Sequence, residues 1–298
     1  MIRGKLFGLA VLPAFILVRY ARRKIAWWYK NAVMRKKAES ILSQLPFLQR
    51  RREIGSGNIG IVYDVMLNNG WRDEMQVLWQ TLNPMPERVA VKIVPMESGS
   101  RQAETLCHLA PRIESATAAS KPLALCPFLA LGLLNHHQTR EPFLVEIMPF
   151  LQAESLLKVL RREKVQYREG IKELMRVFDT IFFLESQGCF ERSLDNENVM
   201  VLPDGTWIRI DVDSAEMVQA MPRYRMIRVA RLTAEVLERL HGVPDRARLR
   251  SVLRRLQLTA KCPLKRYEGK PLPKKYQGAL FESPEEVRDA LLSILEGA

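Results

Sequence analysis

The chain has 298 residues, with 46 lysines and arginines against 33 aspartates and glutamates, and so a formal charge of +13. Apolar residues make up 47% and charged residues 27%, close to globular averages, which argues against wholesale disorder, a collagen-like chain or a multi-span membrane protein. The four cysteines (Cys107, Cys126, Cys189 and Cys262) form no CxxC pair, so reduced thiols in a cytosolic setting fit better than a zinc ribbon or a disulfide framework.

The charge is unevenly distributed along the chain. Residues 1–38 carry ten basic residues and no acid, residues 39–222 hold 19 basic and 24 acidic residues, and residues 223–276 hold 16 basic and 4 acidic ones. A mildly acidic body therefore lies between two basic blocks. This pattern argues against a nucleic-acid-binding core, whose basic face would run through the folded module.

The first basic block has features of a membrane anchor. Residues 6–18 form an apolar run of 13 residues, shorter than the ~20 that span a bilayer. A polybasic segment (residues 22–24) and an aromatic belt (residues 27–29) follow. We interpret residues 1–38 as a membrane-associating helix, interfacial or spanning, that contacts an anionic membrane surface on its cytoplasmic side.

Three other interpretations of this block compete with a membrane anchor. A signal peptide needs a small-residue cleavage site, and none follows the apolar run convincingly. A mitochondrial transit peptide is rich in serine, whereas the first serine here is Ser40. The third is a buried helix packed on the domain.

A glycine-rich segment follows over residues 54–62, with Gly55, Gly57 and Gly60 at GxGxxG spacing. A dinucleotide-binding fold would place a helix after this turn, but the β-branched residues here predict a strand, a tight turn and a second strand. Such a hairpin can lay backbone N–H groups over nucleotide phosphates, although the pattern alone is also common in plain turns.

Further elements follow in order. Residues 89–94 predict a strand with Lys92 at its centre, and residues 101–106 open a helix in which Glu104 could pair with that lysine. Residues 143–148 predict another strand, and residues 171–188 a long amphipathic helix.

A loop and a hairpin come next. The loop leads from Leu194 through Asp195 to Asn198, and the hairpin turns at residues 203–205. Its second strand ends at Asp211.

From about residue 50 to 217, this ordered set resembles the protein-kinase-like superfamily. The triplet Asp211-Val212-Asp213 resembles the form seen in compact bacterial sugar and lipopolysaccharide kinases. The resemblance implies ATP and Mg as cofactors. It implies that the glycine loop covers ATP, that Lys92, oriented by Glu104, holds the phosphates, and that the backbone from Glu146 to Met148 forms the adenine hinge. Asn198 and Asp211 would hold the metal ions.

We therefore predict an α+β chain with a bilobal protein-kinase-like fold. Residues 39–150 would form a β-rich N-lobe and residues 151–298 a reduced, helical C-lobe, after the membrane-associating segment. Only 87 residues follow Asp211, without an Ala-Pro-Glu motif, so regulation through an activation loop is not expected. The 31 residues between Gly60 and Lys92 predict an inserted loop or hairpin extension.

The sequence departs from the family at the catalytic base. Counting back from Asn198, Ser193 stands where the catalytic Asp belongs, and an unactivated serine hydroxyl cannot accept a proton at neutral pH. Asp195 could act instead, or could simply cap the loop. Asp213 is a weaker candidate, which we interpret as a helix N-cap.

The second basic block, residues 223–276, predicts two amphipathic helices. Many of its arginines would lie on solvated faces. Its alternative role is a surface for an anionic partner: membrane phosphate, an anionic glycolipid or an acidic protein. Nucleic acid is disfavoured because interleaved aromatic residues are lacking.

Two functions stay open at this point. The first is an atypical ATP- and Mg-dependent kinase that transfers phosphate to a hydroxyl of a protein or lipid-linked sugar at the membrane surface. The second is a pseudokinase, a nucleotide-binding or purely scaffolding protein that lacks the catalytic base. Fold resemblance alone does not decide between them.

Overall fold

A computed structural model describes residues 31–45, 48–56, 60–68, 86–118, 123–191, 194–210, 215–216, 222–263, 267 and 270–296. The fold is α+β with an antiparallel sheet, which confirms the predicted class. The chain divides into two compact units: unit 1 comprises residues 1–99 and 130–147, and unit 2 comprises residues 100–129 and 148–298.

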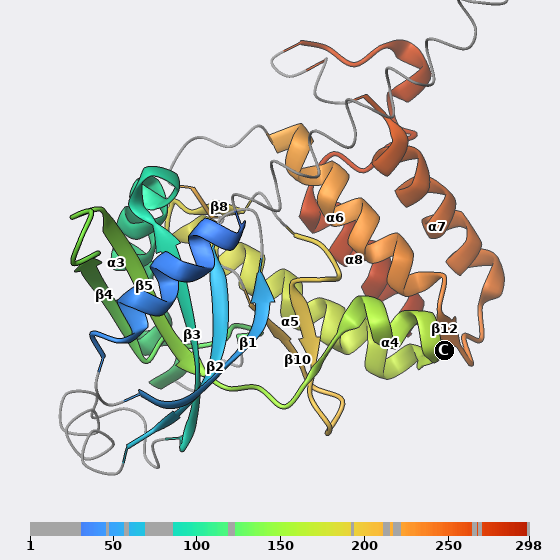
Figure 1. The fold of residues 1–298 in the computed structure, drawn as a ribbon. Coiled ribbons are helices and arrows are strands. Elements are labelled where there is room, and N and C mark those ends of the chain that lie inside the picture. Colours follow the sequence, from blue (N-terminus) through green and yellow to red (C-terminus); the bar gives the residue numbers. More distant parts are fainter. Residues whose placement is uncertain are drawn as a thin grey trace, which may run out of the picture. The chain divides into compact units, whose positions relative to one another are not determined.

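Unit 1 is built on a five-stranded sheet (Figure 1). Its strands are β1 (Leu48–Ser56), β2 (Ile61–Leu67), β3 (Arg88–Pro95), β4 (Ala130–Asn135) and β5 (Pro142–Pro149), in the order β1-β2-β3-β5-β4. The pairs β1–β2, β2–β3 and β4–β5 are antiparallel. Valine and isoleucine dominate β2 and β3, because β-branched side chains pack well on a pleated surface.

A helix over residues 31–42 belongs to the same unit. Its Ala38 and Ile41 are fully buried, and the Arg35 guanidinium donates to both carboxylate oxygens of Glu53 on β1, at 2.8 and 2.9 Å. The last eight residues of the predicted membrane-associating segment therefore start a helix that is tied to the sheet. Residues 1–30 lie outside the described residues, and within the described part no helix could cross a bilayer.

Unit 2 is mainly helical. Its first helix, α3 (Met96–Ala118), begins in the last residues of unit 1. The other helices are α4 (Leu156–Arg162), α5 (Tyr167–Ser186), α6 (Pro222–Leu237), α7 (Arg246–Lys261), the 3-10 helix η3 (Lys274–Tyr276) and α8 (Pro284–Glu296).

Short strands connect these helices. One sheet has the order β10-β9-β6, with β6 (Glu154–Ser155), β9 (Val199–Val201) and β10 (Trp207–Arg209). The remaining pairs are β8 (Phe190–Glu191) with β11 (Ala215–Glu216), and β7 (Val165–Gln166), which runs parallel to β12 (Leu240–His241).

The core of unit 2 surrounds α5, the long helix that the sequence predicted to start at Ile171 and that starts four residues earlier. Ile171, Leu174, Val177 and Phe178 recur at helical spacing and are buried. They join one apolar cluster with residues of α6, α7 and α8. The core thus fixes the start of the loop that follows α5.

Candidate functional site

The strands on either side of the glycine-rich segment, β1 and β2, pair antiparallel, as predicted. A Cβ atom on Gly60 would lie 2.7 Å from the carbonyl oxygen of Ile93 and 2.9 Å from Cγ2 of Val94. The close approach of β2 to β3 therefore requires glycine there. A Cβ on Gly55 would meet no described atom within 4 Å, so packing does not explain that glycine.

The register of the sheet places Lys92 beside this hairpin. Lys92 on β3 pairs with Val62 on β2, and Val62 pairs with Gly55 on β1. Residues directly opposite each other point to the same face of a sheet, so these three form one row across it. Lys92 is only 8% exposed. A buried ammonium group is costly unless it is paired, so strand formation alone does not account for this lysine.

The residues of the predicted adenine hinge belong to β5. Glu146 lies opposite Leu131 of β4 and is 1% exposed. Met148 is half-buried, near the end of the strand. Their backbone is extended, but adenine recognition by this segment stays a prediction.

Glu104 lies on α3, the helix that directly follows the strand of Lys92. Its side chain is exposed. The ion pair that the resemblance implies between Glu104 and Lys92 joins residues of different units and stays a prediction.

Asp195 caps the loop that leads to β9. Its Oδ1 accepts the backbone N–H of Glu197 at 3.1 Å and of Asn198 at 3.2 Å. This Asx turn is the loop cap that the sequence left open beside a catalytic role for Asp195. Asp195 therefore holds the backbone of a predicted metal ligand.

Asn198 is also held from its other side, by the β9–β10 hairpin. Its carbonyl oxygen accepts the backbone N–H of Ile210 at 2.9 Å, next to the pair Val199 and Arg209. The hairpin thus brings Asn198 opposite the residue that precedes Asp211. The predicted turn at residues 203–205 is confirmed, with Gly205 at a φ of 86°.

A carboxylate of α5 positions the second strand of this hairpin. Oε2 of Glu173 accepts the backbone N–H of Trp207 at 2.7 Å and pairs with Arg176 at 2.7 Å. β10 also bridges Leu125 in parallel, through two backbone hydrogen bonds of Arg209 at 2.8 Å. β10 is thereby held at both its first and its last residue.

The sequence does not predict one contact of this loop. The side-chain amide of Asn196 donates to Oε2 of Glu235 on α6, and the backbone carbonyl oxygen of Asn196 accepts the backbone N–H of Leu157 at 3.0 Å. Asn196 is 3% exposed. The only signal in the sequence was its place between Asp195 and Asn198, because its partners are distant along the chain.

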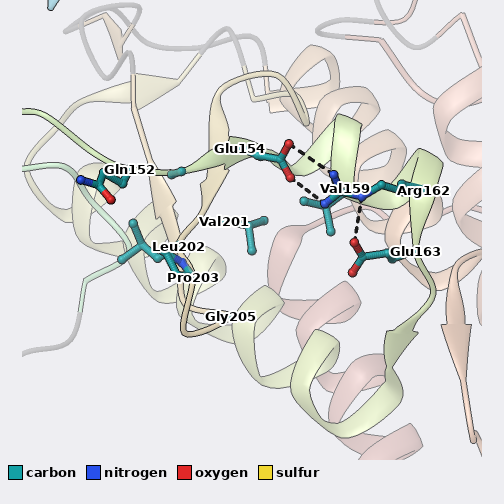
Figure 2. A pocket seen from close by; sticks show the side chains of 10 residues that line it. Gln152, Glu154, Val159, Arg162, Glu163, Val201, Leu202, Pro203 and Gly205 are labelled. Atoms are coloured by element: carbon teal, nitrogen blue, oxygen red, sulfur yellow. Dashed lines mark hydrogen bonds and ion pairs between the residues drawn. The ribbon is translucent and has the colours of Figure 1, made fainter.

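Unit 2 also contains a hollow of about 440 Å³ between β6, α4 and the β9–β10 turn (Figure 2). Arg162 lies there between two carboxylates, 2.6 Å from Glu154 and 2.8 Å from Glu163. Arg162 is the one cation among the described residues that line this hollow, and because it is already paired twice, they offer no free positive charge for an anion. None of the predicted site residues that the structure describes lines it.

Four of the predicted or weighed residues lie outside the described part of the chain: Gly57, Ser193, Asp211 and Asp213. Within the described part, no three His, Cys, Asp or Glu side chains are placed to hold a metal ion. The magnesium ligands that the resemblance implies are the amide of Asn198 and the carboxylate of Asp211. Magnesium binding by these two residues stays a prediction.

Comparisons with known proteins do not identify a family. No protein-family model matches the chain, and no curated protein matches it.

Proposed function

We propose that the chain is an atypical kinase that uses ATP and Mg²⁺ to transfer phosphate to a hydroxyl of a protein or lipid-linked sugar at a membrane surface. The observation that carries the proposal is the row of Gly55, Val62 and buried Lys92 across three strands. Kinases likewise place a glycine-rich loop and a lysine on the third strand over the phosphates of ATP.

The order of the remaining elements supports the same proposal. A helix with Glu104 directly follows the lysine strand, and Asn198 directly precedes the β9–β10 hairpin. Protein kinases pair the lysine with a glutamate of the next helix and use a loop asparagine for the second metal ion.

The proposed roles follow from the chemistry of each group. The backbone of the glycine hairpin would cover the phosphates, and the Lys92 ammonium would neutralise their charge. Mg²⁺ prefers oxygen ligands such as the amide of Asn198 and the carboxylate of Asp211. The backbone of Asn198 is fixed from two sides, which suits a group that must hold a metal with little reorganisation.

A specific observation favours the pseudokinase as a second candidate. Ser193 occupies the position of the catalytic base, and the carboxylate of the nearest substitute, Asp195, already binds two backbone N–H groups. The Oδ1 atom of Asp195 is therefore engaged by its own loop. Phosphoryl transfer relies mainly on positioning and charge neutralisation, so the lack of a dedicated base does not exclude activity.

Nucleotide binding followed by transfer separates the two functions. We expect the wild-type chain to bind Mg-ATP and to release phosphate or phosphorylate itself. Lys92→Ala and Asp211→Ala should weaken ATP binding, whereas Lys158→Ala, which removes an exposed lysine of α4, should not. Thermal melting of each variant without nucleotide controls for loss of fold.

Two results would decide against the kinase. ATP binding without transfer, with either Mg²⁺ or Mn²⁺, would identify a pseudokinase. Absence of any nucleotide binding by the wild-type chain would leave only a scaffold. The anchoring role of residues 1–30 is tested separately, by fractionation of a chain that lacks them and keeps the helix over residues 31–42. Unchanged recovery with membranes would contradict an anchor in residues 1–30.

A further inference from the structure

In the second basic block, some cations pair within unit 2, whereas others are exposed and make no such contact. Some arginines stabilise unit 2 itself: Arg225 pairs with Glu185 of α5 at 2.5 Å, and Arg255 pairs with Glu286 of α8 at 2.6 Å. Arg248 donates to a backbone carbonyl of α8 at 2.7 Å. These three contribute to packing between helices.

Four other cations of α7 make no contact of this kind within unit 2. Arg246, Arg250, Arg254 and Lys261 are exposed, and none makes an ion pair or side-chain hydrogen bond to any residue that the structure describes. Leu258 lies among them and is 47% exposed. We call these five residues the α7 stripe.

Helical geometry places the α7 stripe on one face. At 100° per residue, its members fall within an arc of about 120°, and the buried Val252 and Leu256 lie on the opposite side. α6 and α8 contact α7 within unit 2, and α7 lies at the outer edge of this helical group (Figure 1). The stripe extends over about 22 Å along the helix axis.

This charge arrangement is unfavourable for α7 by itself. Arg246, Arg250 and Arg254 follow one another at i,i+4 spacing, where like charges destabilise a helix. The first turn of α7 contains no acidic side chain, and Arg246 lies at the positive end of the helix dipole, where a cation is unfavourable. Asp245, the N-cap, offsets part of this dipole, but it accepts the backbone N–H of Arg248 at 2.8 Å and pairs with the Arg248 guanidinium at 3.9 Å, not with Arg246. An external anion would relieve the repulsion.

We propose that the α7 stripe binds the headgroups of an anionic phospholipid bilayer. A straight, one-sided row of cations is complementary to a flat anionic surface, and the exposed Leu258 can enter the boundary between headgroups and acyl chains. Nucleic acid fits less well, because α7 contains no aromatic residue for stacking. Gln257, which falls within the same arc of the helix, donates its side-chain amide to Glu238 at 2.7 Å, so this amide is not free to bind a base edge. The inference depends neither on phosphate transfer nor on residues 1–30.

Vesicle co-sedimentation of the full chain tests the proposal. The vesicles contain phosphatidylcholine alone or with phosphatidylglycerol. The double variant Arg250→Gln/Arg254→Gln removes two cations from the stripe. The matched control Lys158→Gln/Lys172→Gln removes two exposed cations elsewhere in unit 2, on α4 and α5. Each Lys or Arg near an anionic membrane contributes about 1 kcal/mol, so the stripe variant should bind anionic vesicles about thirtyfold more weakly.

Further variants and controls show whether a loss of vesicle binding comes from the α7 stripe. The control variant should bind like wild type, Leu258→Ser should weaken binding at unchanged charge, and thermal melting should show all variants folded. Equal loss in the control and the stripe variant, or equal binding of wild type to neutral and anionic vesicles, would overturn the proposal. A larger loss of binding to single-stranded RNA than to vesicles in the stripe variant would also overturn it.

Discussion

The two units position their candidate residues by different physical means. In unit 1, sheet register sets Gly55, Val62 and Lys92 in one row, and the strands approach closely at Gly60. In unit 2, side chains of the loop after α5 bind backbone N–H groups and a distant carboxylate on α6.

This difference determines which substitutions should disturb the geometry of each region. A site held by register depends on volume, because any added atom must displace a neighbouring strand. A site held by polar side chains depends on individual hydrogen bonds, and loses its geometry in steps. Substitutions that add volume in unit 1 and remove acceptors in unit 2 therefore test the comparison.

The largest effect is expected at Gly60. Gly60→Ala brings a Cβ to 2.7 Å from the Ile93 carbonyl oxygen, and we expect it to lower the free energy of unfolding by about 2–3 kcal/mol, as overpacking does. The matched substitution Gly55→Ala meets no described atom within 4 Å and should leave stability nearly unchanged. Urea unfolding of both variants measures the difference.

The pair of glycines also tests the nucleotide proposal. If the backbone at Gly55 lies against phosphates, Gly55→Ala should weaken ATP binding at unchanged stability. Equal stability losses at Gly55 and Gly60 would contradict the distinction between a packing glycine and a ligand-facing one.

A smaller loss is expected for the contact between Asn196 and Glu235. Removal of either partner leaves a buried polar group without its hydrogen bond, which should cost about 2 kcal/mol. Asn196→Ala, Glu235→Ala and the double variant form a cycle, and the double variant should lose less than the sum of the two. Strict additivity in thermal or urea unfolding would show that the contact does not couple the loop to α6.

Asp195 should have a smaller effect on stability. Asp195→Ala removes the acceptor for the N–H groups of Glu197 and Asn198 and should lower the free energy of unfolding by about 1 kcal/mol. Asp195→Asn keeps a side-chain oxygen for the same turn and should lose less. Transfer that survives in Asp195→Asn would exclude Asp195 as the base, whereas its selective loss at unchanged stability would assign that role.

The smallest effect concerns the ion pair of Lys37 and Glu141 in unit 1. The hydrogen bond from Lys37 holds the pKa of Glu141 below its ordinary value of 4.5. Because this folded-state pKa is depressed, the pair stabilises the fold above about pH 4.5, and its contribution is lost as the pH falls through the folded-state pKa. Lys37→Gln should therefore be less stable than wild type at neutral pH but not in acid.

Lys36→Gln is the control, because Lys36 is exposed on the same helix. A similar pH-dependent loss of stability in Lys36→Gln would contradict the assignment to the pair of Lys37 and Glu141.

Unit 2 contains a carboxyl group whose pKa shifts in the opposite direction. Burial raises the pKa of Glu185 even though Arg225 lowers it. The contribution of Glu185 to stability therefore decreases as the pH rises through its folded-state pKa.

Local patterns in the sequence predicted much of the fold. The glycine spacing between β-branched residues predicted the β1–β2 hairpin, and helical periodicity from Ile171 predicted α5. Boundaries shifted by a few residues, as at Tyr167, because apolar spacing does not define where a helix begins. The Asx turn at Asp195 could also be predicted, since it involves only neighbouring residues, whereas a catalytic role for Asp195 stays a prediction.

The sequence by itself determined which residue types stand at each position, and so the candidate chemistry: a lysine within a strand, an amide before a hairpin, a serine in the place of a base. Only the tertiary structure decided which of them meet. The pairing of Gly55 with Val62 and Lys92, the clash that forbids a side chain at Gly60, and the contact of Asn196 with Glu235 depend on strand register and helix packing. The same holds for the charge. Composition showed a basic block, whereas packing decided which of its arginines pair within unit 2 and which face outward on α7.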